Sequence, residues 1–311
     1  MEIIIALTTL FLAVLAHCLT ERYARMALLE NQLEQLMLSE VITPGACYSG
    51  ITRFRAHRAH PCESCGKTHS ILEHFSLFAM LWPCPKRSAF YLFMGEILFM
   101  AVAWLFWGKF GLQPWFFVFL ALWFLFYIIT IIDFRYFIIP DELNFSGIGL
   151  GVGLALIGEV VKQMDRDSVP VFLQGFDKIW NLKSCGLGIL FSAGLLFVIA
   201  WLCSRWLGRD AMGGGDIKLI AMIGSIMGVQ GAMFTLALSS IAGSLFGLGF
   251  LIKAKLVDKH KGFTMIAYGP YLILAALIVL FVGPESMARM YEEWSMRFVN
   301  LAMPWVGSAI M

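Results

Sequence analysis

The chain has 311 residues, of which 59% are hydrophobic and only 14% are charged, and its formal net charge is +2. A soluble domain carries about 25% charged residues, so this composition excludes an ordinary soluble protein and indicates an all-α, polytopic membrane protein. The small net charge does not suggest a nucleic-acid partner, and we expect membrane lipid around most of the chain.

Apolar stretches long enough to cross a membrane occur along most of the sequence. A helix needs about 17 to 25 apolar residues to span the hydrocarbon core. We predict about eight spans, of which the sixth is short and interrupted by glycine: 3–19, 89–107, 114–132, 145–161, 186–206, 217–230, 232–252 and 264–283. Most of the 23 Lys and Arg residues follow the first, third, fifth and seventh spans, and the positive-inside rule makes those loops cytoplasmic.

These spans divide the chain into four parts. Residues 1–19 form transmembrane helix 1, and 20–88 form a cytoplasmic insert between helices 1 and 2. Residues 89–283 form a membrane core of about seven helices, and 284–311 form an outer amphipathic segment. The insert holds four of the seven cysteines, and in the reducing cytoplasm clustered cysteines favour metal binding over disulfides.

The third span ends in "IIDFRYFIIPDELN" (131–144), which contains two candidate acidic residues. Asp133 closes an apolar run at the cytoplasmic edge, where ionisable groups are costly and are functional by default. Alternatively, Asp133 is an interfacial residue paired with Arg135. Asp141 follows Pro140, which is typical of a helix start, and we interpret it as the capping residue of the fourth span. It remains the competitor for the role of first aspartate.

The sixth span begins in "GGGDIKL" (213–219), and the predicted topology puts Asp216 at the same membrane edge as Asp133. Two neighbouring carboxylates share one proton, so one can act as general base on water while the other acts as general acid. Gly213 and Gly215 would let backbone approach closely, and Lys218 is either a contact of the site or a cytoplasmic anchor. Alternatively, Asp216 is an ordinary first-turn residue stabilised by the helix dipole, or the two aspartates form a proton or cation relay in a transporter.

Three segments together resemble the bacterial type IV prepilin peptidases, which are GxGD-type membrane aspartyl proteases. "GGGDIKL" resembles their Gly-x-Gly-Asp-x-Lys-Leu motif, "IIDFRYFIIPDELN" their Asp and Pro-Asp motif, and "AYGPYL" (267–272) a segment before the last span. The resemblance covers about residues 62–280 and implies that Asp133 and Asp216 are the catalytic pair. It also implies site-shaping roles for the other motif residues: Gly213, Gly215, Lys218, Pro140, Asp141, Gly269 and Pro270.

The resemblance implies a specific activity. Such enzymes remove the basic leader from type IV prepilins, or from pseudopilins of type II secretion, at the cytoplasmic face of the bacterial inner membrane. Proteolysis requires no cofactor, and many members also N-methylate the new terminus with S-adenosylmethionine. A presenilin-like protease is disfavoured, because Ile132 precedes Asp133 where that group has tyrosine, and no Pro-Ala-Leu segment is present.

The chain departs from the family in its cytoplasmic insert. The family's two Cys-x-x-Cys pairs bind zinc, whereas this chain offers Cys62, Cys65 and Cys84 as candidate ligands. A tetrahedral zinc site needs four ligands, so another residue would have to complete it, and the alternative is a remnant without metal. Glu96 matches a glutamate of the family. Residues 20–60 match no family segment. Methyltransferase activity is associated with this first cytoplasmic region of the family, so the resemblance implies peptidase activity more strongly than N-methylation.

Overall fold

The computed structural model describes residues 2, 5–20, 23, 89–111, 113–164, 180–208, 212–253, 267–283, 286 and 289. Across these ranges, all of the regular secondary structure is helical. Five helices are long and apolar enough to cross a membrane: Phe93–Phe110, Trp115–Tyr136, Asp141–Gln163, Leu182–Leu207 and Gly214–Gly249. Two further apolar helices, Ile5–Thr20 and Gly269–Val282, are shorter. The predicted all-helical, polytopic class is therefore confirmed.

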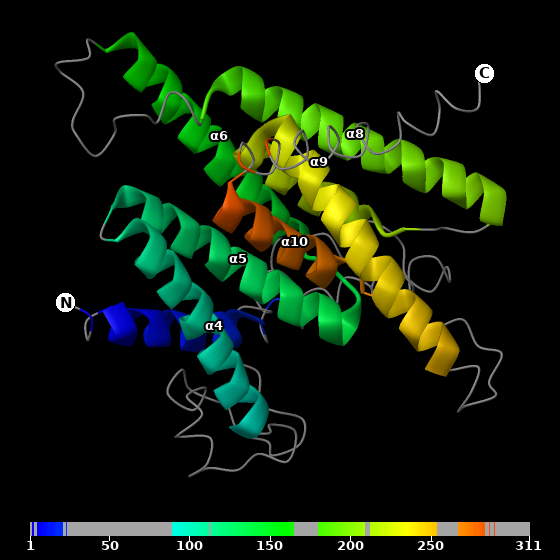
Figure 1. Ribbon diagram of the computed structural model, residues 1–311, viewed down its shortest axis with the longest axis horizontal. Coiled ribbons are helices and arrows are strands. Elements are labelled where there is room, and N and C mark those ends of the chain that lie inside the picture. Colours follow the sequence, from blue (N-terminus) through cyan, green and yellow to red (C-terminus); the bar gives the residue numbers. More distant parts are fainter. Residues whose placement is uncertain are drawn as a thin grey trace, which may run out of the picture. The chain divides into compact units, whose positions relative to one another are not determined.

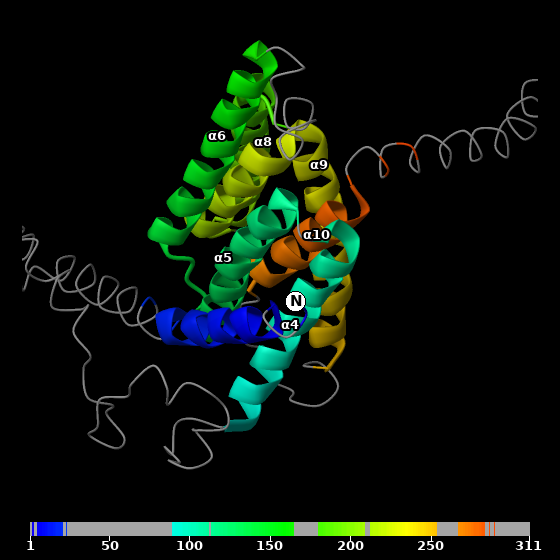
Figure 2. The same ribbon diagram turned by 90° about the vertical axis from the view of Figure 1, so that its left-hand side faces the viewer.

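The chain divides into two compact units, of which the first spans Met1–Leu143. It contains the N-terminal helix Ile5–Thr20, α4 (Ala89–Phe110) and α5 (Pro114–Tyr136). Figures 1 and 2 both show the N-terminal helix beside α4 and α5. The α4–α5 connection is tight because Gly111 adopts a left-handed φ of 60° and a proline starts the next helix, where its missing N–H costs nothing.

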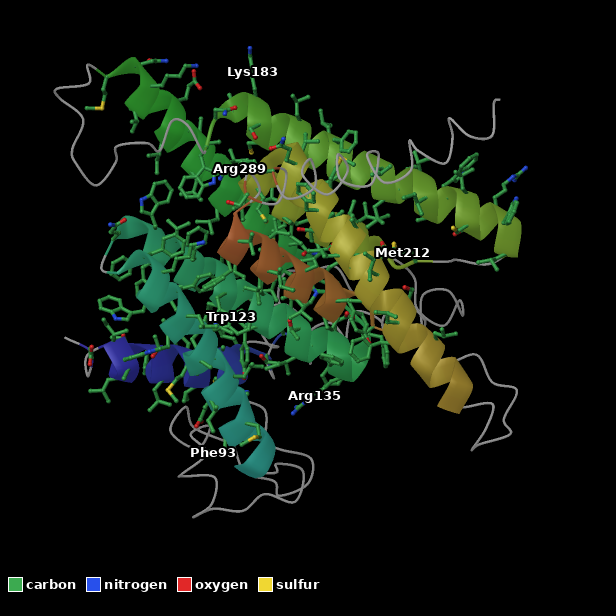
Figure 3. The ribbon with its side chains drawn as sticks, in the orientation of Figure 1. Phe93, Trp123, Arg135, Lys183, Met212 and Arg289 are labelled. Atoms are coloured by element: carbon green, nitrogen blue, oxygen red, sulfur yellow. The ribbon has the colours of Figure 1, made fainter. Side chains whose placement is uncertain are left out.

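The first unit is held together by a buried aromatic and polar cluster. Trp123 of α5 stacks on Phe99 of α4 with ring centroids 5.7 Å apart, and its Nε1 donates to the Phe99 carbonyl at 3.1 Å (Figure 3). The Tyr127 hydroxyl lies 2.9 Å from Nε2 of His17 on the N-terminal helix. Gly95 of α4 lies against both groups, so its missing side chain leaves room for this contact.

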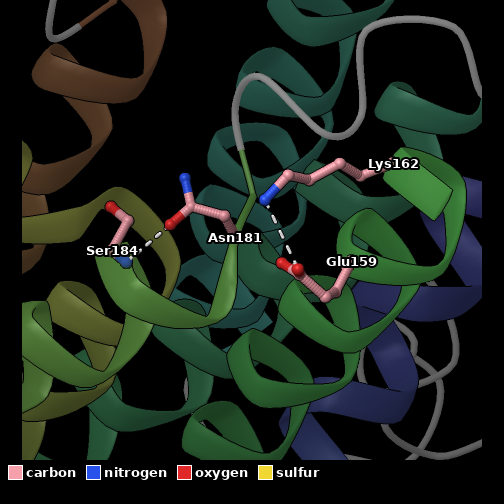
Figure 4. A network of polar contacts seen from close by, with 4 residues as sticks. All are labelled: Glu159, Lys162, Asn181 and Ser184. Atoms are coloured by element: carbon pink, nitrogen blue, oxygen red, sulfur yellow. Dashed lines mark hydrogen bonds and ion pairs between the residues drawn. The ribbon is translucent and has the colours of Figure 1, made fainter.

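The second unit spans Asn144–Met311 and contains nearly all of α6 (Asp141–Gln163), with α8 (Leu182–Leu207), α9 (Gly214–Lys253) and α10 (Gly269–Val282). The side chain of Asn181 caps α8 by accepting from the Ser184 backbone N–H at 2.7 Å (Figure 4). The same view shows Glu159 and Lys162 of α6, an exposed i,i+3 ion pair at 3.4 Å. An exposed pair of this kind contributes little to stability.

Helix α9 consists of two helical segments that meet at Gly228. This residue has φ 67° and ψ −171°, which no helix accommodates, and the chain bends there (Figure 2). The predicted spans 217–230 and 232–252 place the break between the two helices at residue 231. The structure places it three residues earlier, at Gly228. The physical reason is that Gly228 takes the left-handed φ, which only glycine adopts without a penalty.

Small residues allow the helices of the second unit to approach closely. Gly188 of α8 lies against the Gly224 carbonyl of α9, and Ser192 donates across the same contact to the Ile220 carbonyl at 3.0 Å. On α6, Gly147 packs on Met222 of α9. Close backbone approach through glycine is the usual packing mode of helices in membranes. These contacts hold the first segment of α9, which carries Asp216, between α6 and α8.

Candidate functional site

Asp133 lies in the last turn of α5, in the first unit. Its residue is only 5% exposed, and its backbone carbonyl accepts from the Phe137 N–H at 2.9 Å. Phe137 ends the helix in the left-handed conformation, with φ 55° and ψ 31°, a position that glycine usually fills. A nearly buried carboxylate at the end of an apolar helix needs polar partners, and this environment differs from that of an ordinary surface aspartate.

The geometry of α5 also bears on the alternative role for Asp133. Arg135 is exposed and extends away from the helix (Figure 3), whereas Asp133 is buried. Residues two apart on a helix do not face each other, so the helix does not favour a direct Asp133–Arg135 pair. Asp141 is the first residue of α6 and is exposed, which is the position expected for a residue that starts a helix.

Asp216 lies in the first turn of α9, in the second unit. It is half-buried, and its backbone N–H donates to the Gly213 carbonyl at 3.2 Å. A Cβ atom on Gly213 would lie 3.9 Å from the Asp216 carboxylate, so this glycine keeps one approach to the carboxylate open. Gly213 is exposed and Gly215 is half-buried, as expected for backbone that a second chain can approach.

Lys218 does not share a helix face with Asp216, because the two residues are two apart. Its Nζ lies 6.0 Å from the centroid of the Phe145 ring of α6. A cation over an aromatic ring at this distance is weakly attracted to it. The structure thus places Lys218 at the contact between α6 and the start of α9.

The "AYGPYL" residues lie at the start of α10. Gly269 and Pro270 are buried in its first turn, and the Tyr268 hydroxyl lies 2.8 Å from Oγ of Ser239 on α9. This hydrogen bond therefore holds the start of α10 against the second helical segment of α9. The structure gives Gly269 and Pro270 a packing environment, and their site-shaping role stays a prediction.

Asn144, the last residue of "PDELN", is not among the residues that the motifs predicted for the site. Its residue is fully buried, at 0% exposure, and neither its side-chain oxygen nor its side-chain nitrogen has a hydrogen-bond partner among the residues described. The available signal was its spacing from Gly147 and Gly151, which places all three on one face of α6.

The predicted metal ligands Cys62, Cys65 and Cys84 lie outside the described residues, as do most of the insert 20–88 and of the segment 284–311. Within the described ranges, no three His, Cys, Asp or Glu side chains are grouped so that they could hold a metal ion. Glu96 is described and is buried in α4, at 4% exposure.

The fold and the two carboxylates define a class: a polytopic helical membrane protein with acidic residues at the ends of two apolar helices. Part of the chain is similar to a known protein family. Residues 118–248, which include both aspartates, match the type IV leader peptidase family. Over these residues the chain is similar to type IV leader peptidases, as the resemblance of its motifs implied.

Relatives with the name prepilin leader peptidase/N-methyltransferase share about 30% identity with this chain. The protein of Aeromonas salmonicida strain A449 is 30% identical over 163 residues, which cover 52% of this chain and 48% of the relative. That of Aeromonas hydrophila is 27% identical over 243 residues, covering 74% and 73%, and that of Escherichia coli K12 is 30% identical over 154 residues, covering 49% and 57%. The match thus spans about half the length of the first of these relatives. No solved structure matches the chain.

Proposed function

We propose that this protein is a membrane aspartic endopeptidase that removes the basic leader from type IV prepilins or pseudopilins. The observation that carries the proposal is the family match over residues 118–248, which contains Asp133 and Asp216, each in a helix turn at the end of an apolar span. Burial of Asp133 and glycine backbone beside Asp216 support catalytic roles for both. The named relatives support prepilins as the substrate class.

In the proposed mechanism, Asp133 and Asp216 share one proton and bind one water molecule. The ionised carboxylate removes a proton from the water, whose oxygen attacks the scissile carbonyl carbon. The protonated carboxyl then donates its proton to the leaving nitrogen, so the peptide bond breaks and the pair again holds one proton. No metal or nucleotide takes part in these steps.

The membrane arrangement follows from the same proposal. Eight spans result if the N-terminal helix, the two parts of α9 and α10 each cross the membrane, which makes residues 89–283 a peptidase core of about seven helices. The C-terminal end of α5 and the start of α9 then lie at the cytoplasmic face of the inner membrane, because Lys and Arg gather in the adjoining loops. A relay through the membrane would place acidic groups at mid-depth, whereas both aspartates lie at helix ends.

N-methylation of the new terminus is a second candidate activity, favoured by the names of the relatives. It would use S-adenosylmethionine as the methyl donor. The region that departs from the family, 20–60, lies almost wholly outside the described residues. The peptidase proposal does not depend on methylation, on zinc or on an oligomeric state.

Cleavage of a prepilin in membranes tests the proposal, with wild type compared with Asp133→Asn, Asp216→Asn and Asp141→Asn. We expect cleavage to be lost by at least about 10³-fold in the first two variants, because each removes one member of the acid–base pair. Asp141→Asn is the matched comparison from the same motif: Asp141 is not a member of the acid–base pair, so this variant should retain cleavage where the first two lose it. Loss with Asp141→Asn and retention with Asp133→Asn would identify Asp141 as the first aspartate. A folded wild type that cuts no prepilin would refute the peptidase assignment.

A further inference from the structure

The side chain of Asn144 combines full burial with two unpartnered polar atoms. Both its Oδ1 and its Nδ2 lack a hydrogen-bond partner within the part of the chain that the structure describes. Buried polar groups are nearly always hydrogen-bonded, because leaving one unpaired costs free energy. At Asn144, therefore, the described residues leave a buried carboxamide unsatisfied.

The helix register shows what Asn144 faces. On α6, Gly147 packs on Met222 and Gly151 packs on Ser225, so the contact positions rise together along both helices. The two helices therefore run parallel along this contact. Asn144 lies one turn before Gly147 on the same face of α6, which brings it level with residues 218 and 219 of α9. The contact between Phe145 and Lys218 confirms this register.

This position is within one turn of Asp216, along the segment that starts α9. The neighbouring backbone is Gly213–Gly215, where no side chain blocks a second chain. Three features therefore meet at the α6–α9 contact: an unpartnered carboxamide, glycine backbone and the proposed catalytic carboxylate.

We propose that the Asn144 carboxamide binds a backbone peptide group of the substrate beside the start of α9. This inference rests on the proposed peptidase function and names a substrate-binding residue for it. A carboxamide presents one acceptor and two donors, so it can pair with the N–H and the C=O of an extended peptide at once. A neutral amide suits a peptide group better than it suits a cation or a phosphate, which charged side chains bind more strongly.

The pairing also explains why the residue is asparagine. Among the described residues the two polar atoms have no partner, and the substrate would supply one, so part of the binding free energy comes from groups that are unpaired before the substrate binds. Replacing Asn144 by an apolar residue of similar size should then stabilise the free protein and weaken substrate binding. A purely structural asparagine would not give these opposite effects.

The test measures substrate affinity separately from cleavage. In an Asp216→Asn background, which we expect to bind without cutting, the dissociation constant of a fluorescent prepilin peptide is measured with and without Asn144→Leu. We expect binding to weaken by about fivefold or more, the range for leaving a peptide group unpaired, while the thermal midpoint of the detergent-solubilised protein stays the same or rises. In the otherwise wild-type chain, Asn144→Leu should lower kcat/KM by a similar factor.

Ser225→Ala is the matched control on the same α6–α9 contact. Its hydroxyl is buried but already donates to the Met222 carbonyl at 2.6 Å, so its removal should leave peptide affinity unchanged. Asn144→Ala serves as a second variant if leucine prevents folding. An unchanged dissociation constant in a folded Asn144 variant overturns the inference. This holds also if kcat falls, because that result would mean that Asn144 binds a water molecule and not the substrate. Failure of wild type to cleave any prepilin would instead refute the peptidase proposal.

Discussion

The contact between α8 and α9 offers a quantitative test of how the second unit is held together. A Cβ atom added to Gly188 would overlap the backbone carbonyl of Gly224 and lie 3.0 Å from the Cα of Gly228. Backbone atoms cannot rotate away as a side chain can. Gly188→Ala therefore forces the two helices apart by on the order of 1 Å, the distance needed to restore van der Waals contact.

The expected cost follows from three effects. Overpacking of a close contact typically costs about 1–3 kcal/mol. Separation also lengthens the Ser192–Ile220 hydrogen bond, now 3.0 Å, and an interhelical bond of this kind in a membrane contributes about 0.6 kcal/mol. Alanine recovers about 0.5–1 kcal/mol as a better helix former. The net destabilisation of Gly188→Ala is then about 1–3 kcal/mol.

Gly194→Ala is the matched control, because it makes the same substitution in the same helix. A Cβ atom on Gly194 meets no atom within 4 Å, so only the helix-propensity gain remains and the variant should be as stable as wild type or more so. Denaturant unfolding in detergent micelles measures both changes. Prepilin cleavage should fall with Gly188→Ala alone, since a shift of about 1 Å in the helix that carries the proposed catalytic Asp216 can cost roughly 100-fold in rate. Equal stability of the two variants would refute the packing argument.

Two further substitutions test the first unit. Tyr127→Phe removes the hydroxyl that lies 2.9 Å from His17 Nε2 and should lower the free energy of unfolding by about 1 kcal/mol; an unchanged value would mean that this buried contact contributes nothing net. Phe137→Gly relieves the left-handed φ of 55° at the end of α5. Because Phe137 is 52% exposed, little burial is lost, and the variant should gain up to about 1 kcal/mol. A destabilised Phe137→Gly would show that the ring makes contacts that outweigh the backbone strain.

The sequence was sufficient for features that depend on local composition and chain direction. Apolar length identified the five long apolar helices, since a helix in hydrocarbon must satisfy its backbone internally. Pro140 followed by Asp141 predicted the start of α6, and the structure begins that helix at Asp141. The sixth span was predicted to begin in "GGGDIKL", and α9 begins at Gly214. Three motifs in order indicated the resemblance to type IV prepilin peptidases.

The tertiary structure decided the features that depend on which helix faces which. Two examples are contacts between residues far apart in the sequence: Gly188 with Gly224, and His17 with Tyr127. A third is the burial of Asn144, which depends on the helices packed around it. The bend of α9 was misplaced by about three residues because the run contains several glycines, and composition alone does not say which of them takes a positive φ. Periodicity specifies how one helix presents its faces, whereas side-chain burial and hydrogen bonding are properties of a pair of helices, and only their packing determines them.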